Sequence, residues 1–261
     1  MKNVNDMLSL NGKTAIVTGG HGNYGKQIVL ALAQAGAKVY TASRNYDAND
    51  SFAKELQAKG LSVHPESFDQ SDEKSIIDFK DRILSKEGKI DVLVNNSVLR
   101  IVNGFNDTKE HFDDSFKTNG TGIIILCREF GDHMAKNRNG SIINIGSYMG
   151  ILGADDNLYE GLSFSGFSAP DYFFHKGGLT NFTKFLASYY GPHNVRCNIL
   201  SLGGLFNNQD EVFVNRYCKR TFLKRMANES DIMGICVLLA SDASSYITGA
   251  TIPIDGGYSA K

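Results

Sequence analysis

Residues 14–25 read TAIVTGGHGNYG, an apolar run followed at once by a glycine-rich segment. The run at 14–18 has the length and the β-branched content of a buried strand. Apolar residues at helical spacing over 24–36 then predict a helix that begins where the glycines end. Glycines carry no Cβ, so they let the backbone N–H groups at a helix N-terminus approach an anion closely. The stretch therefore predicts a strand, a turn and a helix whose junction can bind phosphate groups.

Strand-like and helix-like segments alternate along the rest of the chain. Further strands are expected at 38–42, 61–65, 92–94, 141–145, 195–200 and 250–254, and helices at 73–86, 109–136, 171–190 and 230–240. The strands are apolar on both faces, which is typical of a parallel sheet covered by helices on both sides. With no repeat and no linker, the pattern predicts an α/β fold, a single-domain doubly wound parallel sheet (Rossmann fold) over residues 1–261.

Composition limits the class of protein. With 42% hydrophobic and 21% charged residues, the chain has the composition of a globular domain rather than a disordered one. Its 27 basic and 28 acidic residues nearly cancel, which argues against nucleic-acid binding because that needs a basic surface. The apolar run at 232–240 is too short to span a membrane, and the N-terminus lacks the apolar stretch of a secretory signal. None of the four cysteines has metal-ligand or dithiol spacing. We expect a cytoplasmic protein with no metal, nucleic-acid or membrane partner.

The end of the second strand predicts which dinucleotide the turn would bind. An acidic residue there would accept hydrogen bonds from the ribose of NAD, but this chain has Ser43 and Arg44. A guanidinium pairs well with a 2′-phosphate, which favours NADP(H) and leaves NAD(H) as the alternative. Asp69, after the third strand, either meets the adenine edge or caps a helix that starts near Ser71.

Tyr172 and Lys176 are four residues apart, so on a helix both side chains face the same way. A phenol is a poor base at neutral pH, but a neighbouring ammonium favours its phenolate form. The pair therefore predicts a tyrosine that acts as a general acid or base.

Taken together and in this order, the motifs resemble the short-chain dehydrogenase/reductase family along nearly the whole chain. The glycine-rich turn and the tyrosine–lysine pair are joined by Ser147, at the end of the fifth strand, and by Asn119 in the preceding helix. Two further segments match family motifs, Asn95-Asn96-Ser97-Val98 after the fourth strand and Asp255-Gly256-Gly257 near the end.

The resemblance implies an NAD(P)-dependent oxidoreductase that transfers hydride between nicotinamide and a carbonyl or secondary alcohol of a small molecule. Its catalytic residues would be Asn119, Ser147, Tyr172 and Lys176. Tyr172 would exchange the proton with the substrate oxygen, and Ser147 would hydrogen-bond that oxygen. Lys176 would bind the nicotinamide ribose, and Asn119 would hold a water that links Lys176 to solvent.

The same resemblance implies a cofactor site and an assembly. The residues expected at the cofactor are Gly19, His21, Asn23, Tyr24, Gly25, Ser43, Arg44, Asp69, Asn95, Asn96, Ser97, Tyr172, Lys176, Gly203, Leu205 and Asn207. The helices at 109–136 and 171–190 would pack against their mates in a homodimer or homotetramer.

A few positions depart from the family pattern. Asn23 replaces the middle glycine of the turn, Ser97-Val98 replaces Ala-Gly, and Leu202 stands where a proline commonly precedes Gly203. These changes slightly favour a non-catalytic dinucleotide-binding regulator, the alternative from another class. The four intact catalytic side chains favour an enzyme.

Two irregular segments, 150–170 and 203–225, are the expected substrate loops. The first is rich in carboxylates, rings and hydroxyls (Asp155, Asp156, Tyr159, Glu160, Ser163, Ser165 and Ser168), which suits a sugar or nucleotide sugar; a solvated loop or a subunit contact is the alternative. The second is basic (Arg216, Lys219, Arg220, Lys224 and Arg225) and either binds a phosphate or forms the exposed face of a helix. Both weakly resemble oxidoreductases of flagellin and surface-glycan sugar biosynthesis. A 3-oxoacyl-thioester reductase is the main enzymatic alternative.

Overall fold

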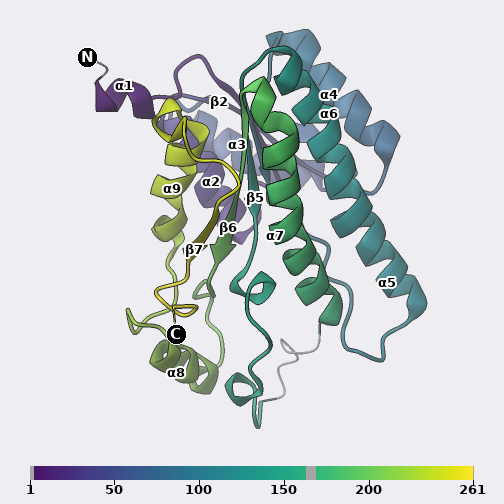
Figure 1. Cartoon of the computed structure of the whole chain (residues 1–261), viewed down its shortest axis with the longest axis vertical. Helices are drawn as coiled ribbons and strands as arrows, with labels where there is room; N and C mark the ends of the chain where they lie inside the picture. The colour runs from purple at the N-terminus through teal and green to yellow at the C-terminus, as the bar shows by residue number, and fades with distance from the viewer. Residues whose placement is uncertain (1–2, 163–168, 261) are drawn as a thin grey trace.

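The computed structural model describes residues 3–162 and 169–260, and its strands form one parallel sheet (Figure 1). In spatial order they are β3 (Val63–Ser67), β2 (Lys38–Ser43), β1 (Thr14–Thr18), β4 (Val92–Asn95), β5 (Gly140–Ile145), β6 (Val195–Leu202) and β7 (Thr251–Ile254). Every neighbouring pair is parallel. The strand order changes direction between β1 and β4, where a doubly wound sheet opens a crevice at the carboxyl ends of its strands. The predicted fold class is confirmed.

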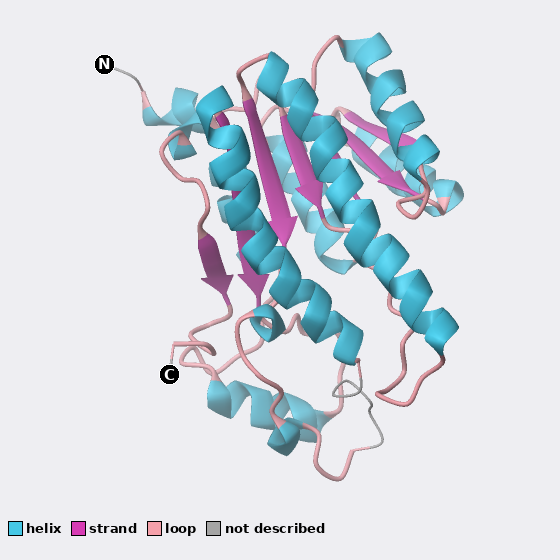
Figure 2. Ribbon diagram, turned by 45° about the vertical axis from the view of Figure 1, so that its right-hand side comes forward, coloured by secondary structure: helices cyan, strands magenta, loops and turns pink. Residues whose placement is uncertain are grey.

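Helices cover both faces of the sheet (Figure 2). On one face lie α2 (Asn23–Gln34), α3 (Tyr46–Gln57) and α9 (Met233–Ala240); on the other lie α4 (Glu73–Glu87), α6 (Ile123–Lys136) and α7 (Pro170–Tyr190). Successive residues of β1 point to opposite faces, because Ala15 and Val17 join the first core and Ile16 joins the second. Burial on both faces explains why the strands are apolar throughout. None of the described helices is both long enough and apolar enough to cross a membrane.

The helices differ from the sequence prediction in several places. The pattern does not predict α1 (Val4–Leu8) or α3. The helix α8 (Glu211–Arg220) lies inside a segment expected to be irregular, where a helix is one of the two interpretations of the basic residues. The helix expected at 109–136 is divided into α5 (Lys109–Phe116) and α6 by a π-helical segment, Lys117–Gly122. A Cβ on Gly122 would overlap the backbone oxygen of Gln70, so this glycine allows the segment to lie close to the loop after β3. Such π-segments are frequent near functional sites.

A third, small core lies beyond the carboxyl ends of β5, β6 and β7. Its buried members are Tyr148, Leu158, Phe213, Tyr217, Met226 and Tyr258. They come from two short 3-10 turns, Tyr148–Gly150 and Asp156–Leu158, from α8 and from the C-terminal segment. This core holds α8 across the lower end of the sheet, next to the loops that follow the strands (Figure 1).

Candidate active site

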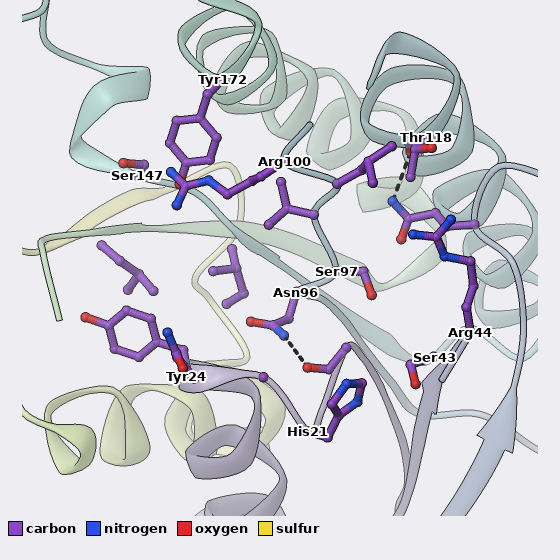
Figure 3. A pocket seen from close by; sticks show the side chains of 18 of the residues that line it. His21, Tyr24, Ser43, Arg44, Asn96, Ser97, Arg100, Thr118, Ser147 and Tyr172 are labelled. Carbon is purple, nitrogen blue, oxygen red and sulfur yellow. Dashed lines mark hydrogen bonds between the residues drawn. The ribbon is translucent and has the colours of Figure 1, made fainter. Parts of the chain in front are cut away.

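A cavity of about 640 Å³ lies at the carboxyl ends of the strands (Figure 3). Segments that follow β1 to β6 line it, together with α7. Of the residues predicted for cofactor binding or catalysis, it is lined by Gly19, His21, Asn23, Tyr24, Ser43, Arg44, Asp69, Asn96, Ser97, Ser147, Tyr172, Lys176 and Gly203. One cavity therefore brings together most of the candidate site, from strands that are far apart in the sequence.

The turn after β1 is tied to the loop after β4. Thr18 Oγ1 accepts hydrogen bonds from the backbone N–H groups of Asn96 and Ser97, both at 3.0 Å. Asn96 Nδ2 donates in return to the oxygens of Thr18 and Gly19, both at 3.0 Å. Gly19 has φ +65°, a left-handed conformation that favours glycine. The backbone of the turn is therefore fixed from two sides.

This turn fits the phosphates of a dinucleotide. Gly22 is the N-cap of α2 and no side chain caps that end, so the first N–H groups of the helix are left for an anion. His21 lines the cavity, and its Nδ1 is buried without a hydrogen-bond partner among the described residues. Burial, together with the charge of Lys26, lowers the pKa of His21 below its usual value. His21 thus adds a side chain with an unpartnered nitrogen to the wall of the cavity at the glycine turn.

The far end of the cavity carries Arg44 and Asp69. Asp69 Oδ1 accepts hydrogen bonds from the N–H and the hydroxyl of Ser71, both at 2.8 Å. Burial alone would raise the pKa of Asp69, but these bonds and the nearby charge of Arg44 lower it below its usual value. The N-cap of α4 is Asp72, so Asp69 shapes the preceding turn rather than capping the helix directly. Its carboxylate stays on the cavity wall beside Arg44.

Ser147, Tyr172 and Lys176 line the other end of the cavity. Lys176 is 7% exposed, and its Nζ donates to the backbone oxygen of Ile145 at 2.6 Å. The same Nζ lies 5.4 Å from the centre of the Tyr172 ring. Burial lowers the pKa of Lys176 below its usual value. The geometry matches a positive charge held beside a phenol, with a serine hydroxyl on the same wall.

Sequence reasoning missed Arg100. Its guanidinium carbon lies 4.3 Å from the centre of the Tyr172 ring, in the arrangement of a cation–π contact (Figure 3). Arg100 is exposed and lines the cavity. It follows the family motif after β4 by two positions, but no spacing rule points to it, because the Arg100–Tyr172 contact forms only in the folded chain.

Asn119 lies in the π-helical segment and does not line the cavity. Its Oδ1 accepts from the N–H of Leu99, and its Nδ2 donates to the oxygen of Leu99, both at 2.8 Å. Nδ2 also lies 3.2 Å from Ser115 Oγ. Within the described chain, its amide therefore holds the loop after β4 against the helix, and no contact joins it to Lys176. The water relay through Asn119 stays a prediction.

Two residues predicted at the cofactor lie behind the cavity wall. A Cβ on Gly25 would overlap the oxygen of Gly19, so Gly25 allows α2 to pack on the turn. Asn95 is 2% exposed, and its Nδ2 donates to Asn144 Oδ1 at 2.8 Å inside the sheet. Both residues support the site through packing rather than through a side chain that faces the cavity.

Two further predicted residues lie outside the cavity, along the loop after β6. They are Leu205 and Asn207, and the side chain of Gln209 bonds to the backbone of each. Its Nε2 donates to the oxygen of Leu205 and its Oε1 accepts from the N–H of Asn207, each at 2.7 Å. Of the residues predicted on this loop, Gly203 alone among the described ones reaches the cavity wall.

Comparison with known proteins identifies the family. The family model described as enoyl-(acyl carrier protein) reductase matches residues 22–259. The chain is 30% identical to gluconate 5-dehydrogenase of Gluconobacter oxydans (strain 621H), over 97% of this chain and 96% of that protein. The chain belongs to the short-chain dehydrogenase/reductase family. It is therefore an NAD(P)-dependent oxidoreductase.

Other members of the family differ in the substrate that they are named for. The 3-oxoacyl-(acyl-carrier-protein) reductase of Thermotoga maritima is 29% identical over 96% of this chain and 99% of that protein. Among solved structures, a gluconate 5-dehydrogenase from Burkholderia cenocepacia J2315, in complex with NADP and tartrate, superposes with a TM-score of 0.89 at 24% identity. The match covers 99% of this chain and 100% of that one. The family sets the fold and the reaction class, and the substrate must be argued from this chain.

The two segments expected to select the substrate contact each other. Arg220 pairs with Asp155 twice, with Nε 2.8 Å from Oδ2 and Nη2 2.9 Å from Oδ1. Arg216 Nη1 donates to the oxygen of Glu160 at 2.6 Å. These charges hold α8 against residues 150–162, which favours a structural role for them over direct binding of a phosphate or a sugar. The predicted serines of the first segment, Ser163, Ser165 and Ser168, lie outside the described residues.

Proposed function

We propose that this short-chain dehydrogenase/reductase uses NADP(H) to interconvert a ketone and a secondary alcohol on a polyhydroxylated small molecule. The main support is that Ser147, Tyr172 and Lys176 share one end of a cavity that has Arg44 at its other end. The uncapped N-terminus of α2 lies on the same cavity wall. One extended dinucleotide would therefore contact Arg44, the turn and the catalytic end together.

Each of the proposed catalytic side chains would have a separate role at the substrate oxygen. When bound, NADP(H) supplies or accepts the hydride. Ser147 and Tyr172 would both hydrogen-bond the substrate oxygen, and Tyr172 would donate its proton in reduction and take it back in oxidation. Lys176 would keep a positive charge beside the phenol and so stabilise the phenolate that forms when the proton leaves.

The preference for NADP(H) rests on Arg44. Within the described chain, no carboxylate forms an ion pair with its guanidinium, so it is available to a 2′-phosphate. Asp69, nearby, already accepts two hydrogen bonds from Ser71. Arg44 would therefore pair with the 2′-phosphate of NADP(H), a group that NAD(H) lacks.

The direct test is a fluorescence titration of the enzyme with NADPH and with NADH, followed by turnover of a panel of keto sugars. We expect tighter binding of NADPH and NADPH oxidation with at least one keto sugar. Tighter binding of NADH would contradict the cofactor assignment. Unchanged turnover in Tyr172→Phe would contradict the catalytic assignment.

A 3-oxoacyl-thioester reductase is the second candidate. It is supported by the relative of that name and by Val98, an apolar side chain that lines the cavity and is 40% exposed. An acyl chain would need such apolar contacts. Comparing kcat/KM for acetoacetyl-CoA with that for keto sugars separates the two candidates, and we expect the sugars to be preferred.

We propose a homodimer or homotetramer formed through α5, α6 and α7. An apolar cavity of about 340 Å³ lies between these helices. Its wall includes Phe174 and Ile124, which are 65% and 51% exposed. Exposed apolar surface of this kind is commonly buried by association. Sedimentation at micromolar concentration should give a dimer or tetramer, and a monomer would contradict the proposal.

We also propose a cytoplasmic location. All four cysteines are free thiols, which suits a reducing compartment. Burial raises the pKa of Cys127 and of Cys236 to about 12, so these thiols are unreactive. Cell fractionation checks the location, and recovery from an oxidising compartment would contradict it.

A further inference from the structure

Arg100 places an unused positive charge next to the catalytic tyrosine. Its guanidinium carbon lies 4.3 Å from the centre of the Tyr172 ring, and Figure 3 shows the side chain reaching across the cavity toward that ring. A cation–π contact occupies the flat face of the guanidinium. The N–H groups at its edge are then left for a ligand in the cavity.

The described carboxylates do not balance this charge. Asp69 is the one carboxylate among the described residues that line the cavity, and it lies at the opposite end, beside Arg44. Asp155 pairs with Arg220. Asp171 is 6% exposed and accepts a hydrogen bond from Ser115. Within residues 3–162 and 169–260, no carboxylate forms an ion pair with Arg100, and the sequence of 163–168 contains no acidic residue.

The position of Arg100 is fixed by a chain of hydrogen bonds that leads back to the helix of Tyr172. Leu99, its neighbour, is held at both its N–H and its oxygen by the amide of Asn119. Asn119 bonds in turn to Ser115 Oγ, and Ser115 donates to Asp171 Oδ2 at 2.5 Å. Asp171 directly precedes Tyr172. The loop that carries Arg100 is therefore preorganised relative to the phenol, which lowers the cost of ordering it around a ligand.

We propose that Arg100 binds a carboxylate of the substrate, so that the enzyme selects sugar acids over neutral sugars. The planar fork of a guanidinium matches the two oxygens of a carboxylate. A carboxylate also carries the single negative charge that one guanidinium balances. Because Arg100 lies against Tyr172, the carboxylate belongs to the same small molecule as the reacting carbon. The inference rests on the proposed function, and it names the feature of the substrate that the site recognises.

The test compares acids with neutral ligands in which a hydroxymethyl group replaces each carboxylate. D-gluconate and D-glucitol differ only in having a carboxylate or a hydroxymethyl group at C1, and tartrate and threitol form a second pair. Calorimetry would measure their binding to the enzyme saturated with NADPH, the form of the cofactor that cannot oxidise an alcohol, using the natural chain, Arg100→Ala and Arg100→Lys. A matched control is Lys136→Ala, which removes one positive charge from an exposed site outside the cavity.

We expect the natural chain to bind at least one of the two acids more tightly than its neutral counterpart. Arg100→Ala should weaken that binding by about 10–100-fold and leave the neutral ligands unchanged, since hydrogen bonds to charged groups contribute that much. Arg100→Lys should recover part of the lost affinity, because lysine keeps the positive charge but lacks the planar pair of N–H groups that can bind both carboxylate oxygens. Lys136→Ala should bind like the natural chain.

Three results would overturn the inference. The first is equal binding of acids and neutral counterparts, or no effect of Arg100→Ala. The second is tighter, Arg100-dependent binding of glucose 6-phosphate, which would identify a phosphate as the group recognised. The third is a loss of NADPH affinity in Arg100→Ala, which would place Arg100 at the cofactor. Because these readouts measure binding, they stand apart from the turnover of Tyr172→Phe that tests the proposed function.

Discussion

The two ends of the cavity are built in different ways. At the cofactor end, the segments at the ends of two adjacent strands are joined by the hydroxyl of Thr18 and the side-chain amide of Asn96, each bonded to the backbone of the other segment at 3.0 Å. At the catalytic end, Tyr172 and Arg100 approach from separate segments, and side-chain hydrogen bonds connect the segments that carry them. The glycine turn at the cofactor end is therefore held by bonds between neighbouring strands, and the catalytic end is built from side chains of segments far apart in the sequence. We expect substitutions at the catalytic end to change the chemistry without loss of the cofactor.

Tyr172→Phe should have the largest effect. Removing the phenol hydroxyl removes the group that exchanges the proton, so kcat should fall about 10³-fold. The dissociation constant for NADPH should change little, because the ring and its neighbours remain. Stopped-flow turnover and fluorescence titration measure the two quantities on one sample. A parallel loss of NADPH binding would mean that the two ends of the cavity are not separable.

Lys176→Met should come next. The buried ammonium stabilises charge in the reaction, so kcat should fall about 10²-fold. Desolvation of the same ammonium opposes folding, so the variant should unfold at a temperature no lower than that of the natural chain. Thermal melting checks this, and a clear loss of stability would show that the bond to Ile145 outweighs the cost of burial.

The pH dependence of stability follows from the lowered pKa of Lys176. Between that pKa and the usual value of 10.5, the unfolded chain binds more protons than the folded one does. The contribution of Lys176 to the free energy of unfolding should therefore rise with pH across that window. The difference in melting temperature between Lys176→Met and the natural chain should shrink as the pH increases. A difference that stays constant would contradict the lowered pKa.

Arg44→Ala tests the cofactor end. Losing a bidentate partner of the 2′-phosphate should weaken NADPH binding by about 10-fold or more. NADH binding should change little, since it offers no phosphate at that position. Equal losses for both cofactors would remove the case for NADP(H). Arg138→Ala, a substitution of another exposed arginine that does not line the cavity, serves as the control.

Asp155→Asn should have the smallest effect. It weakens the pair with Arg220, which is 36% exposed, so the stability should fall by no more than about 1 kcal/mol. Looser packing of α8 should raise KM for the substrate a few-fold and leave kcat nearly unchanged. Steady-state kinetics with the best substrate measures the split, and a large loss of kcat would give α8 a more direct role.

The cofactor end could be predicted from the sequence because its signal is contiguous. The strand, the glycines and the helix follow one another over 14–25, so their order predicts a turn that can bind phosphates, and the later motifs strengthen that prediction. Tyr172 and Lys176 are predicted from their spacing and Ser147 from a family motif, and the structure places all three at one end of the cavity. Asn119 was matched in the same way, but its amide faces Leu99 rather than the cavity.

Features that depend on distant partners could not be predicted in this way. Arg100 has no periodic or spaced signal, and its neighbour Tyr172 is fixed only by the fold. The helix α8 is short and packs on a segment 65 residues away, as the Arg220–Asp155 pair shows. The opposite charges of the two irregular segments, acidic at 150–170 and basic at 203–225, weakly indicate that the two segments contact each other. Gly120 and Gly122 also weakly indicate an irregular point in the helix expected at 109–136, because glycine is a poor helix former.

The strand order also has a consequence for synthesis on the ribosome. β1, β2 and β3 can pair once residue 67 has emerged, but the second side of β1 stays open until Val92–Asn95 follows. During that interval β1, an inner strand of the finished sheet, is an apolar edge, which is a template for pairing with another nascent chain. The arrival of β4 closes this edge and brings Asn96 to the glycine turn. The glycine turn is thus held from both sides as soon as β4 pairs with β1, long before Tyr172 is synthesised.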